Sequence, residues 1–95
     1  MILSFDCDDT EKLFYGQKVS KKFIVPAQLH SKTVECLQIM HAVTSLQDFW
    51  LKPSLKLKKV INKKAYYELR INNKYRIYFK WTEQGAGKAR AGKHL

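Results

Sequence analysis

Side chains that suit phosphate chemistry gather in one short stretch of the sequence, residues 66–81, which reads YYELRINNKYRIYFKW. Its two arginines, Arg70 and Arg76, carry planar guanidinium groups that can each hold a phosphate through two parallel hydrogen bonds. Tyrosines between these cations suit RNA, because unstacked bases pack on aromatic rings. The stretch therefore predicts a nucleic-acid site on one side of an extended chain. The polar side chains that share that side are Tyr66, Glu68, Arg70, Arg76, Tyr78 and Lys80.

A β-hairpin must position these side chains, because apolar residues alternate with them on both halves of the stretch. The apolar residues of the two halves share one face only if Ile71 lies opposite Tyr75, which requires a three-residue loop, residues 72–74. Such loops commonly end in a left-handed residue. The same register places Arg70 opposite Arg76, Glu68 opposite Tyr78, and Tyr66 opposite Lys80.

The facing arginines have a structural explanation as well as a functional one. Like charges directly opposite each other destabilise a sheet. Glu68 is the diagonal neighbour of Arg76 on the other strand, so its carboxylate can neutralise one guanidinium. Both interpretations stay open, because Arg70 and Lys80 still leave an excess of positive charge on this side of the hairpin.

The rest of the sequence predicts helices before the hairpin and an irregular end after it. The second helix has the clearest pattern, because apolar residues recur at spacings of three and four from Leu29 to Val43. Residues 82–95 are rich in glycine and have no period, so we expect a flexible C-terminal tail. The other expected elements are a strand over Met1–Phe5, a helix capped by Asp8 or Asp9 that ends at Gly16, a helix beginning at Pro26, a short helix over 44–50, and a basic loop or edge strand over 52–64.

The composition fits a small globular protein with a polyanionic partner. The 95 residues are enough for one domain, and 18 basic against 8 acidic residues give a net charge of +10. No apolar run is long enough to span a membrane, and the N-terminus lacks the regions of a signal peptide. Two cysteines and three histidines show no metal-ligand spacing, so we expect neither metal nor cofactor, in a cytoplasmic protein.

The segment YELRINNKYRIYFKW resembles the central hairpin of the HigB-type toxins, which belong to the RelE/ParE superfamily (plasmid maintenance system killer family). The opening MILSFDCDDTEKLFYGQ resembles that family's N-terminus, and HAVTSLQDF followed by PSLKL matches it in kind and order. The resemblance covers residues 1–81 as a single RelE/HigB-like domain. It implies an α+β fold, RelE-like, with two N-terminal helices packed on a small, mostly antiparallel sheet with a central hairpin.

The resemblance also implies the toxin of a type II toxin–antitoxin system, a ribosome-dependent and metal-independent endoribonuclease (mRNA interferase) that inhibits translation. Its implied partners are a helix-turn-helix antitoxin of the HigA kind, the ribosome and messenger RNA. Arg76 matches the family's sheet arginine that contacts the scissile phosphate, and Arg70 matches another sheet arginine. Lys58 falls where the family often has a residue that helps catalysis, and His94 resembles part of its catalytic ending. The residues implied to bind RNA or the ribosome are Lys21, Lys22, Lys56, Lys59, Lys63, Lys64, Tyr66, Tyr78 and Lys80.

The tail departs from this family, whose members usually finish with a further strand and an acidic–aromatic–histidine ending. RNA cleavage needs a base for the 2′-hydroxyl and an acid for the leaving oxygen, and the sequence offers His94, Tyr66 and Tyr78 without choosing between them. Two alternatives stay open: a catalytically weak or inactive relative that binds antitoxin or RNA, and a ParE-like poison of DNA gyrase. The lysines along the expected RNA side favour RNA over gyrase.

Overall fold

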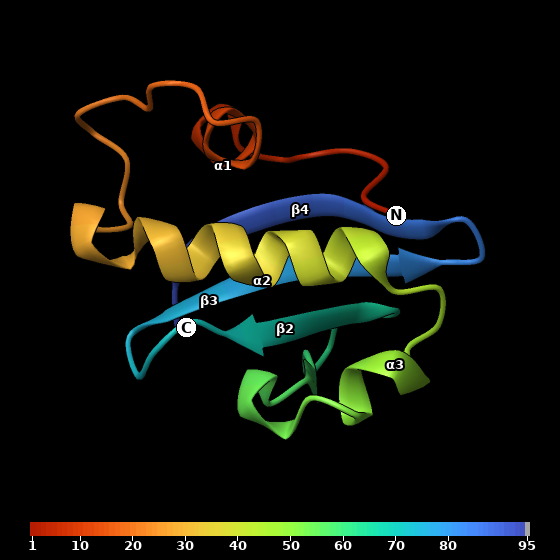
Figure 1. Cartoon of the computed structure of the whole chain (residues 1–95). Coiled ribbons are helices and arrows are strands. Elements are labelled where there is room, and N and C mark those ends of the chain that lie inside the picture. The colour runs from red at the N-terminus through yellow and green to blue at the C-terminus, as the bar shows by residue number, and fades with distance from the viewer. Residues whose placement is uncertain (95) are drawn as a thin grey trace.

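The computed structural model describes residues 1–94 and shows an α+β fold, in which helices cover one face of a four-stranded antiparallel sheet (Figure 1). Helix α2 lies across the middle of that face, α1 lies beside the β4 edge, and α3 lies beside β2 (Figure 1). The strand order is β1-β2-β3-β4, so consecutive strands are neighbours. The elements are α1 (Asp8–Phe14), η1 (Ala27–Leu29), α2 (His30–Ala42), α3 (Gln47–Trp50), η2 (Pro53–Leu55), β1 (Lys58–Lys59), β2 (Tyr66–Arg70), β3 (Tyr75–Thr82) and β4 (Gly85–Lys93).

The register predicted for the central hairpin is confirmed. Arg70 pairs with Arg76, and the backbone N–H of Ile71 donates to the Tyr75 carbonyl at 3.0 Å. The turn differs from the expected type, because no residue of the loop 72–74 has a positive φ. Instead the side-chain oxygen of Asn72 accepts hydrogen bonds from the backbone N–H groups of Lys74 and Tyr75, both at 2.9 Å. A side chain that imitates a backbone turn therefore closes the hairpin.

The core lies between α2 and the sheet, as the apolar pattern predicts. The α2 side chains at the helix spacing are buried, and Thr33 satisfies its hydroxyl by donating to the Leu29 carbonyl at 2.8 Å. On the sheet side, Leu69, Ile77 and Phe79 are fully buried. Phe79 packs against the Phe49 ring of α3, with ring centroids 5.7 Å apart. This burial fixes one face of the hairpin and thereby turns its polar side chains to the other.

Helix α1 ends as predicted but begins differently. Gly16 follows it with φ +73°, the left-handed conformation that lets glycine terminate a helix. Cys7 occupies the N-cap position, so the prediction that Asp8 or Asp9 caps the helix was wrong. Asp9 lies inside the first turn, where its carboxylate accepts from the Ser20 backbone N–H at 2.8 Å and ties the following connector to the helix.

The prediction of a C-terminal tail without strand structure was wrong, because β4 spans Gly85–Lys93 and pairs with β3 along its length. The core side of β4 consists of alanines, Ala86, Ala89 and Ala91, all buried. Alanine and glycine have low strand propensity and little hydrophobic contrast, so the alternation was invisible in the sequence. Small side chains also let the helices pack close to this strand, as the Thr10 hydroxyl shows by accepting from the Ala91 N–H at 3.1 Å.

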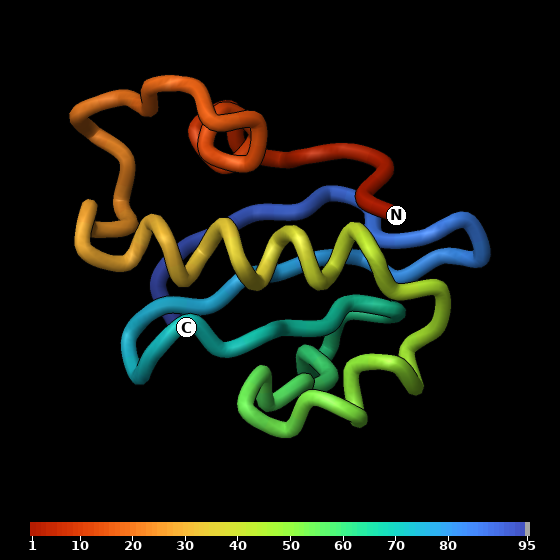
Figure 2. The backbone as a smooth tube through the Cα atoms, in the orientation of Figure 1, coloured from red at the N-terminus to blue at the C-terminus, as the bar shows by residue number. Residues whose placement is uncertain are grey.

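The expected N-terminal strand over Met1–Phe5 is present only as two isolated bridges. Ile2 and Phe5 pair in parallel with Ala86 and Ala89 of β4. The backbone tube shows this arm running along β4 before it enters α1 (Figure 2). Among residues 1–94, no helix is long and apolar enough to cross a membrane.

Candidate nucleic-acid interface

The face of the sheet turned away from α2, called here the open face, carries polar side chains from all four strands. The register places Lys58, Glu68, Tyr78 and Arg90 in one row across β1 to β4. Arg70, Arg76 and Gly92 form the next row, and Tyr66 faces Lys80 on the other side. Glu68 is the one carboxylate that the strands contribute to this face. The open face is therefore strongly cationic.

Arg76 is not a free cation, because its guanidinium is held on several sides. Its Nε donates to Glu68 Oε2 at 3.0 Å, and the two side chains are only 12% and 13% exposed. Its Nη1 donates to the Asn72 carbonyl and to the Tyr75 carbonyl, the latter at 3.1 Å. The diagonal contact foreseen from the sequence is thus present. Arg76 both neutralises Glu68 and fastens the hairpin turn.

Arg70 is bound less extensively than Arg76. Its guanidinium donates to the side-chain oxygen of Asn73, an exposed loop residue, and within residues 1–94 it forms no ion pair. Glu68 therefore neutralises Arg76, whereas the facing Arg70 keeps its positive charge. This resolves the like-charge conflict that the register creates.

His94 lies at the same end of the open face, close to Glu68. Its Nε2 is 3.9 Å from Glu68 Oε2, and its side chain is 46% exposed. The His94 backbone N–H donates to the Lys74 carbonyl at 2.7 Å, which ties the residue to the hairpin loop. The structure therefore brings Arg70, Arg76 and His94 together, although the sequence placed His94 in a flexible tail.

The centre of the open face is built around Tyr78. Its ring is almost fully buried, and its hydroxyl donates to the Lys93 carbonyl at 3.1 Å. The Arg90 guanidinium lies over this ring, 5.0 Å from the centroid. Gly92 makes room for it, since a Cβ at that position would come within 2.7 Å of Arg90 Nη1. Tyr78 is thus a platform that supports a cation.

The lysines of residues 52–64 do not all lie on the same side of the sheet. Lys58 lies on the open face opposite Glu68, whereas Lys59 pairs with Tyr67 and lies on the opposite side of the edge strand. Lys56 precedes the strand with φ 49°, and Lys63 and Lys64 lie in the turn that follows it, where Lys63 Nζ lies 4.7 Å from the Tyr66 ring centroid. We expected a loop or an edge strand for this segment, and the structure shows both: an edge strand of two residues, Lys58–Lys59, and irregular chain on either side of it.

Lys21 and Lys22 do not join the strands that carry the other candidates. They lie in the connector between α1 and η1, which runs beside the helices (Figure 2). The Lys22 backbone N–H donates to the Ser20 hydroxyl at 3.1 Å, so the connector has a local turn. Any contact that these lysines make with RNA is separate from the open face.

Two cations of the open face were missed by sequence reasoning, Lys88 and Arg90. Both lie on β4, whose core side is built from alanines rather than from larger apolar residues. The available signal was the spacing of two between Lys88 and Arg90, with small residues between and after them. A strand assignment for the tail would have placed both beside Tyr78.

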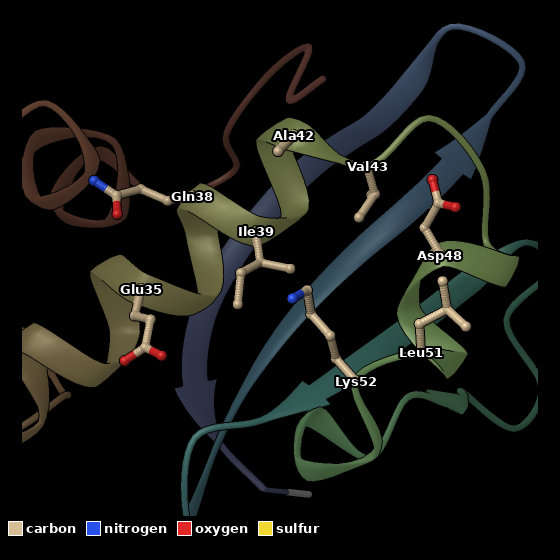
Figure 3. A pocket seen from close by; sticks show the side chains of 8 residues that line it. All are labelled: Glu35, Gln38, Ile39, Ala42, Val43, Asp48, Leu51 and Lys52. Atoms are coloured by element: carbon tan, nitrogen blue, oxygen red, sulfur yellow. The ribbon is translucent and has the colours of Figure 1, made fainter.

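A second concave surface lies on the helical side, between α2 and α3 (Figure 3). It measures about 550 Å³, and Ile39, Val43 and Leu51 give it an apolar lining. Lys52 extends between the two helices (Figure 3). At its rim, hydrogen bonds from the Thr44 and Ser45 backbone N–H groups lower the pKa of Asp48. This groove has neither the arginines nor the tyrosines of the open face.

The Cys36 thiol also has a shifted pKa, and its role is structural. Burial raises the pKa of the Cys36 thiol in α2, although nearby Lys32 opposes the shift. A buried thiol with a raised pKa stays protonated and packs as a small apolar side chain.

A family model described as the RelE-like toxin of type II toxin–antitoxin system HigB matches residues 3–90 of the chain. The matched region includes the helices, β1 to β3 and most of β4, so it extends beyond the segment that carried the resemblance. The comparison with curated proteins found no match.

Proposed function

The chain belongs to the RelE-like HigB toxins of type II toxin–antitoxin systems, and we propose that it is an mRNA interferase, a ribosome-dependent endoribonuclease that inhibits translation. The observation that carries the proposal is the open face. Cations from all four strands lie there beside two tyrosines, with Glu68 as the single strand carboxylate. Such a surface suits a single-stranded RNA, whose phosphates meet a groove of cations.

The arginines are proposed to stabilise charge on the phosphorus centre. Arg70 is charged and accessible, so it suits a phosphate oxygen directly. Arg76 is held rigidly through Nε and Nη1, and its Nη2 has no hydrogen bond within residues 1–94. A cation fixed before the substrate arrives costs little reorganisation during the reaction, which favours the transition state. Lys58, opposite Glu68, adds charge on the β1 side.

His94 is the proposed proton-transfer group. The 2′-hydroxyl attacks phosphorus, a base takes its proton, the bond from phosphorus to the 5′-oxygen breaks, and an acid protonates that oxygen. His94 lies next to Glu68 and is accessible, and an imidazole exchanges protons near neutral pH. Tyr78 suits the role less well, because its hydroxyl is buried and donates to the Lys93 carbonyl.

The lysines outside the strand rows are proposed to dock the toxin on the ribosome. Lys56, Lys63 and Lys64 flank β1, Lys59 lies in β1 on the side away from the open face, and Lys21 and Lys22 lie beside the helices. Long flexible cations suit ribosomal RNA phosphates, which need charge rather than exact geometry. Family membership implies an antitoxin partner, and a helix-turn-helix protein of the HigA kind is the proposed one.

The test is cleavage of messenger RNA by the purified chain in a reconstituted translation reaction, mapped by primer extension with and without ribosomes. We expect cuts only when ribosomes are present. His94→Gln should abolish cleavage, whereas Lys93→Gln, which removes a neighbouring exposed charge, should leave most of it. Cleavage that persists in His94→Gln would remove His94 from the reaction.

The neutralisation of Arg76 by Glu68 favours a second candidate, a relative that binds RNA or antitoxin without cutting. This candidate predicts a folded chain that sediments with ribosomes and leaves the message intact. The same primer-extension experiment separates the two, because ribosome binding is common to both and cleavage is not.

A further inference from the structure

A small pocket lies on the open face beside its centre. It measures about 90 Å³ and is the space between the turn after β1, the centre of the sheet and β4. The volume corresponds to about three water molecules at ~30 Å³ each, which is room for one phosphate group and too little for a whole nucleotide. The lining residues are Asp6, Val60, Lys63, Tyr66, Tyr78, Lys88 and Arg90.

The cations of this pocket have no counter-ion. Among residues 1–94, Lys63, Lys88 and Arg90 form no ion pair. Lys63 lies over the Tyr66 ring and Arg90 lies over the Tyr78 ring, at 4.7 and 5.0 Å from the centroids. A ring face holds a cation in place without neutralising it. Three cationic side chains therefore line one small pocket, and a bound anion would offset their repulsion.

The backbone around Lys88 is unusual in the same place. Lys88 has φ 54°, a left-handed conformation that is costly for a residue with a Cβ. The pairing of β3 with β4 shifts between Tyr78 and Lys80, so β4 bulges there. Bulges re-aim side chains and are frequent next to functional sites. Here the bulge brings the Lys88 side chain to the pocket beside Arg90.

Asp6 is the one carboxylate that lines the pocket. It belongs to the N-terminal arm, where its backbone N–H donates to the Ala89 carbonyl at 3.0 Å. The Ser4 hydroxyl of the same arm accepts from the Lys88 N–H at 2.9 Å. The arm is thus fixed at Asp6 and at Ser4, two residues before it. It holds one negative charge against the three positive ones, without an ion pair to any of them.

We propose that this pocket binds a single phosphate group of a polynucleotide, and that Asp6 competes with the phosphate for the three cations. The site adds a contact beside the centre of the open face, between the turn after β1 and β4, and it does not include Arg76 or His94. It deepens the proposed function by giving the RNA a second phosphate contact, and rests on that function only for the source of the phosphate. The pocket itself requires neither ribosomes nor cleavage.

The test is a titration of the purified chain with inorganic phosphate, followed by amide chemical shifts, and repeated with a short single-stranded RNA. Lys63→Gln and Lys64→Gln form a matched pair, because both are exposed neighbours in one turn and only Lys63 lines the pocket. Lys63→Gln should weaken phosphate binding about threefold to tenfold, while Lys64→Gln changes it less than about twofold. The shifts should centre on Tyr66, Tyr78 and Lys88.

Asp6→Asn tests the competition directly. Removing the carboxylate should tighten phosphate binding about threefold or more, whereas Asp8→Asn, on α1 and outside the pocket, should not. Equal weakening of phosphate binding by Lys63→Gln and Lys64→Gln would mean that phosphate responds to a diffuse positive field and does not bind in the pocket. No tightening in Asp6→Asn would overturn the competition, and no shifts at the pocket would overturn the site.

The two proposals fail separately. A chain that binds phosphate at the pocket but leaves messenger RNA uncut on ribosomes would overturn the interferase alone. A chain that cuts on ribosomes, with unchanged RNA affinity in Lys63→Gln and Arg90→Gln, would overturn the phosphate pocket alone.

Discussion

Two regions of the open face, the hairpin end and the pocket lined by Lys63 and Arg90, use positive charge in different ways. At the hairpin end, Arg76 is bonded to Glu68 and to the loop carbonyls, and its side chain is 12% exposed. At the pocket, Lys63 and Arg90 lie on tyrosine rings, and within residues 1–94 neither forms an ion pair. The charge of Arg76 therefore holds the sheet together, whereas the charges at the pocket remain for a ligand.

This difference has a thermodynamic consequence. A mostly buried carboxylate such as Glu68 is left poorly solvated when it loses its cation, which costs more than the pair itself contributes. An exposed cation over a ring contributes little to folding and can be removed at small cost. Substitutions at the hairpin end should consequently lower stability, whereas substitutions at the pocket should weaken binding.

The largest effect is expected for Arg76→Gln. It leaves Glu68 without its 3.0 Å partner and frees the Asn72 carbonyl. We expect a loss of about 2 kcal/mol in the free energy of unfolding, measured by urea denaturation. Arg70→Gln, at the facing position, removes only a bond to exposed Asn73 and should cost much less.

Removing the Glu68 charge together with that of Arg76 makes the stability measurement more specific to the ion pair. The double variant Glu68→Gln with Arg76→Gln removes both charges and should recover part of the stability that Arg76→Gln loses. If Arg76→Gln costs no more stability than Arg70→Gln, the Glu68–Arg76 ion pair does not hold the hairpin end.

A smaller effect, on binding rather than stability, is expected for Gly92→Ala. The added Cβ would meet Arg90 Nη1 at 2.7 Å and push the guanidinium off the Tyr78 ring. Because the clash is with the end of a flexible side chain, stability should change by less than about 1 kcal/mol. Phosphate affinity should fall about fivefold, equivalent to ~1 kcal/mol.

Gly87→Ala is the control for that substitution. Gly87 lies on the same strand opposite Lys80, but a Cβ there meets Ser4 Oγ at an ordinary 3.6 Å. It should change neither stability nor phosphate affinity appreciably. Equal losses of affinity in the two glycine variants would show that the position of the Arg90 guanidinium does not matter.

The hairpin end of the open face could be predicted from the sequence, whereas the β4 side of the pocket could not. The hairpin register followed from the alternation of Leu69, Ile71, Ile77 and Phe79 with charged residues, because a slip of one residue would bury the charges. The Glu68–Arg76 pair followed from that register. Helix α2 followed from its apolar spacing in the same way.

Strand β4 was not predictable from its own residues. Its buried side is alanine, and it is stabilised by pairing with β3 and by packing against the helices. Because the strand was not predicted, Lys88 and Arg90 were not recognised as residues of the open face. The hydrogen bond that orders His94 on the Lys74 carbonyl was not foreseen either. The missing information was tertiary, since pairing and packing override local propensity there.

The smallest effect is expected on β1, where two adjacent lysines allow the open face to be compared with the opposite side of one strand. Lys58 lies opposite Glu68 on the open face, and Lys59 lies opposite Tyr67 on the other side. If RNA follows the open face, Lys58→Gln should reduce the slope of log affinity against log salt by about 0.7, the value for one phosphate of a single strand. Lys59→Gln should leave the slope unchanged, because its side chain points away from that path. Both variants remove the same charge from the same two-residue strand, so net charge cannot account for a difference. Equal slopes for both would mean that the RNA crosses the edge of the sheet rather than its open face.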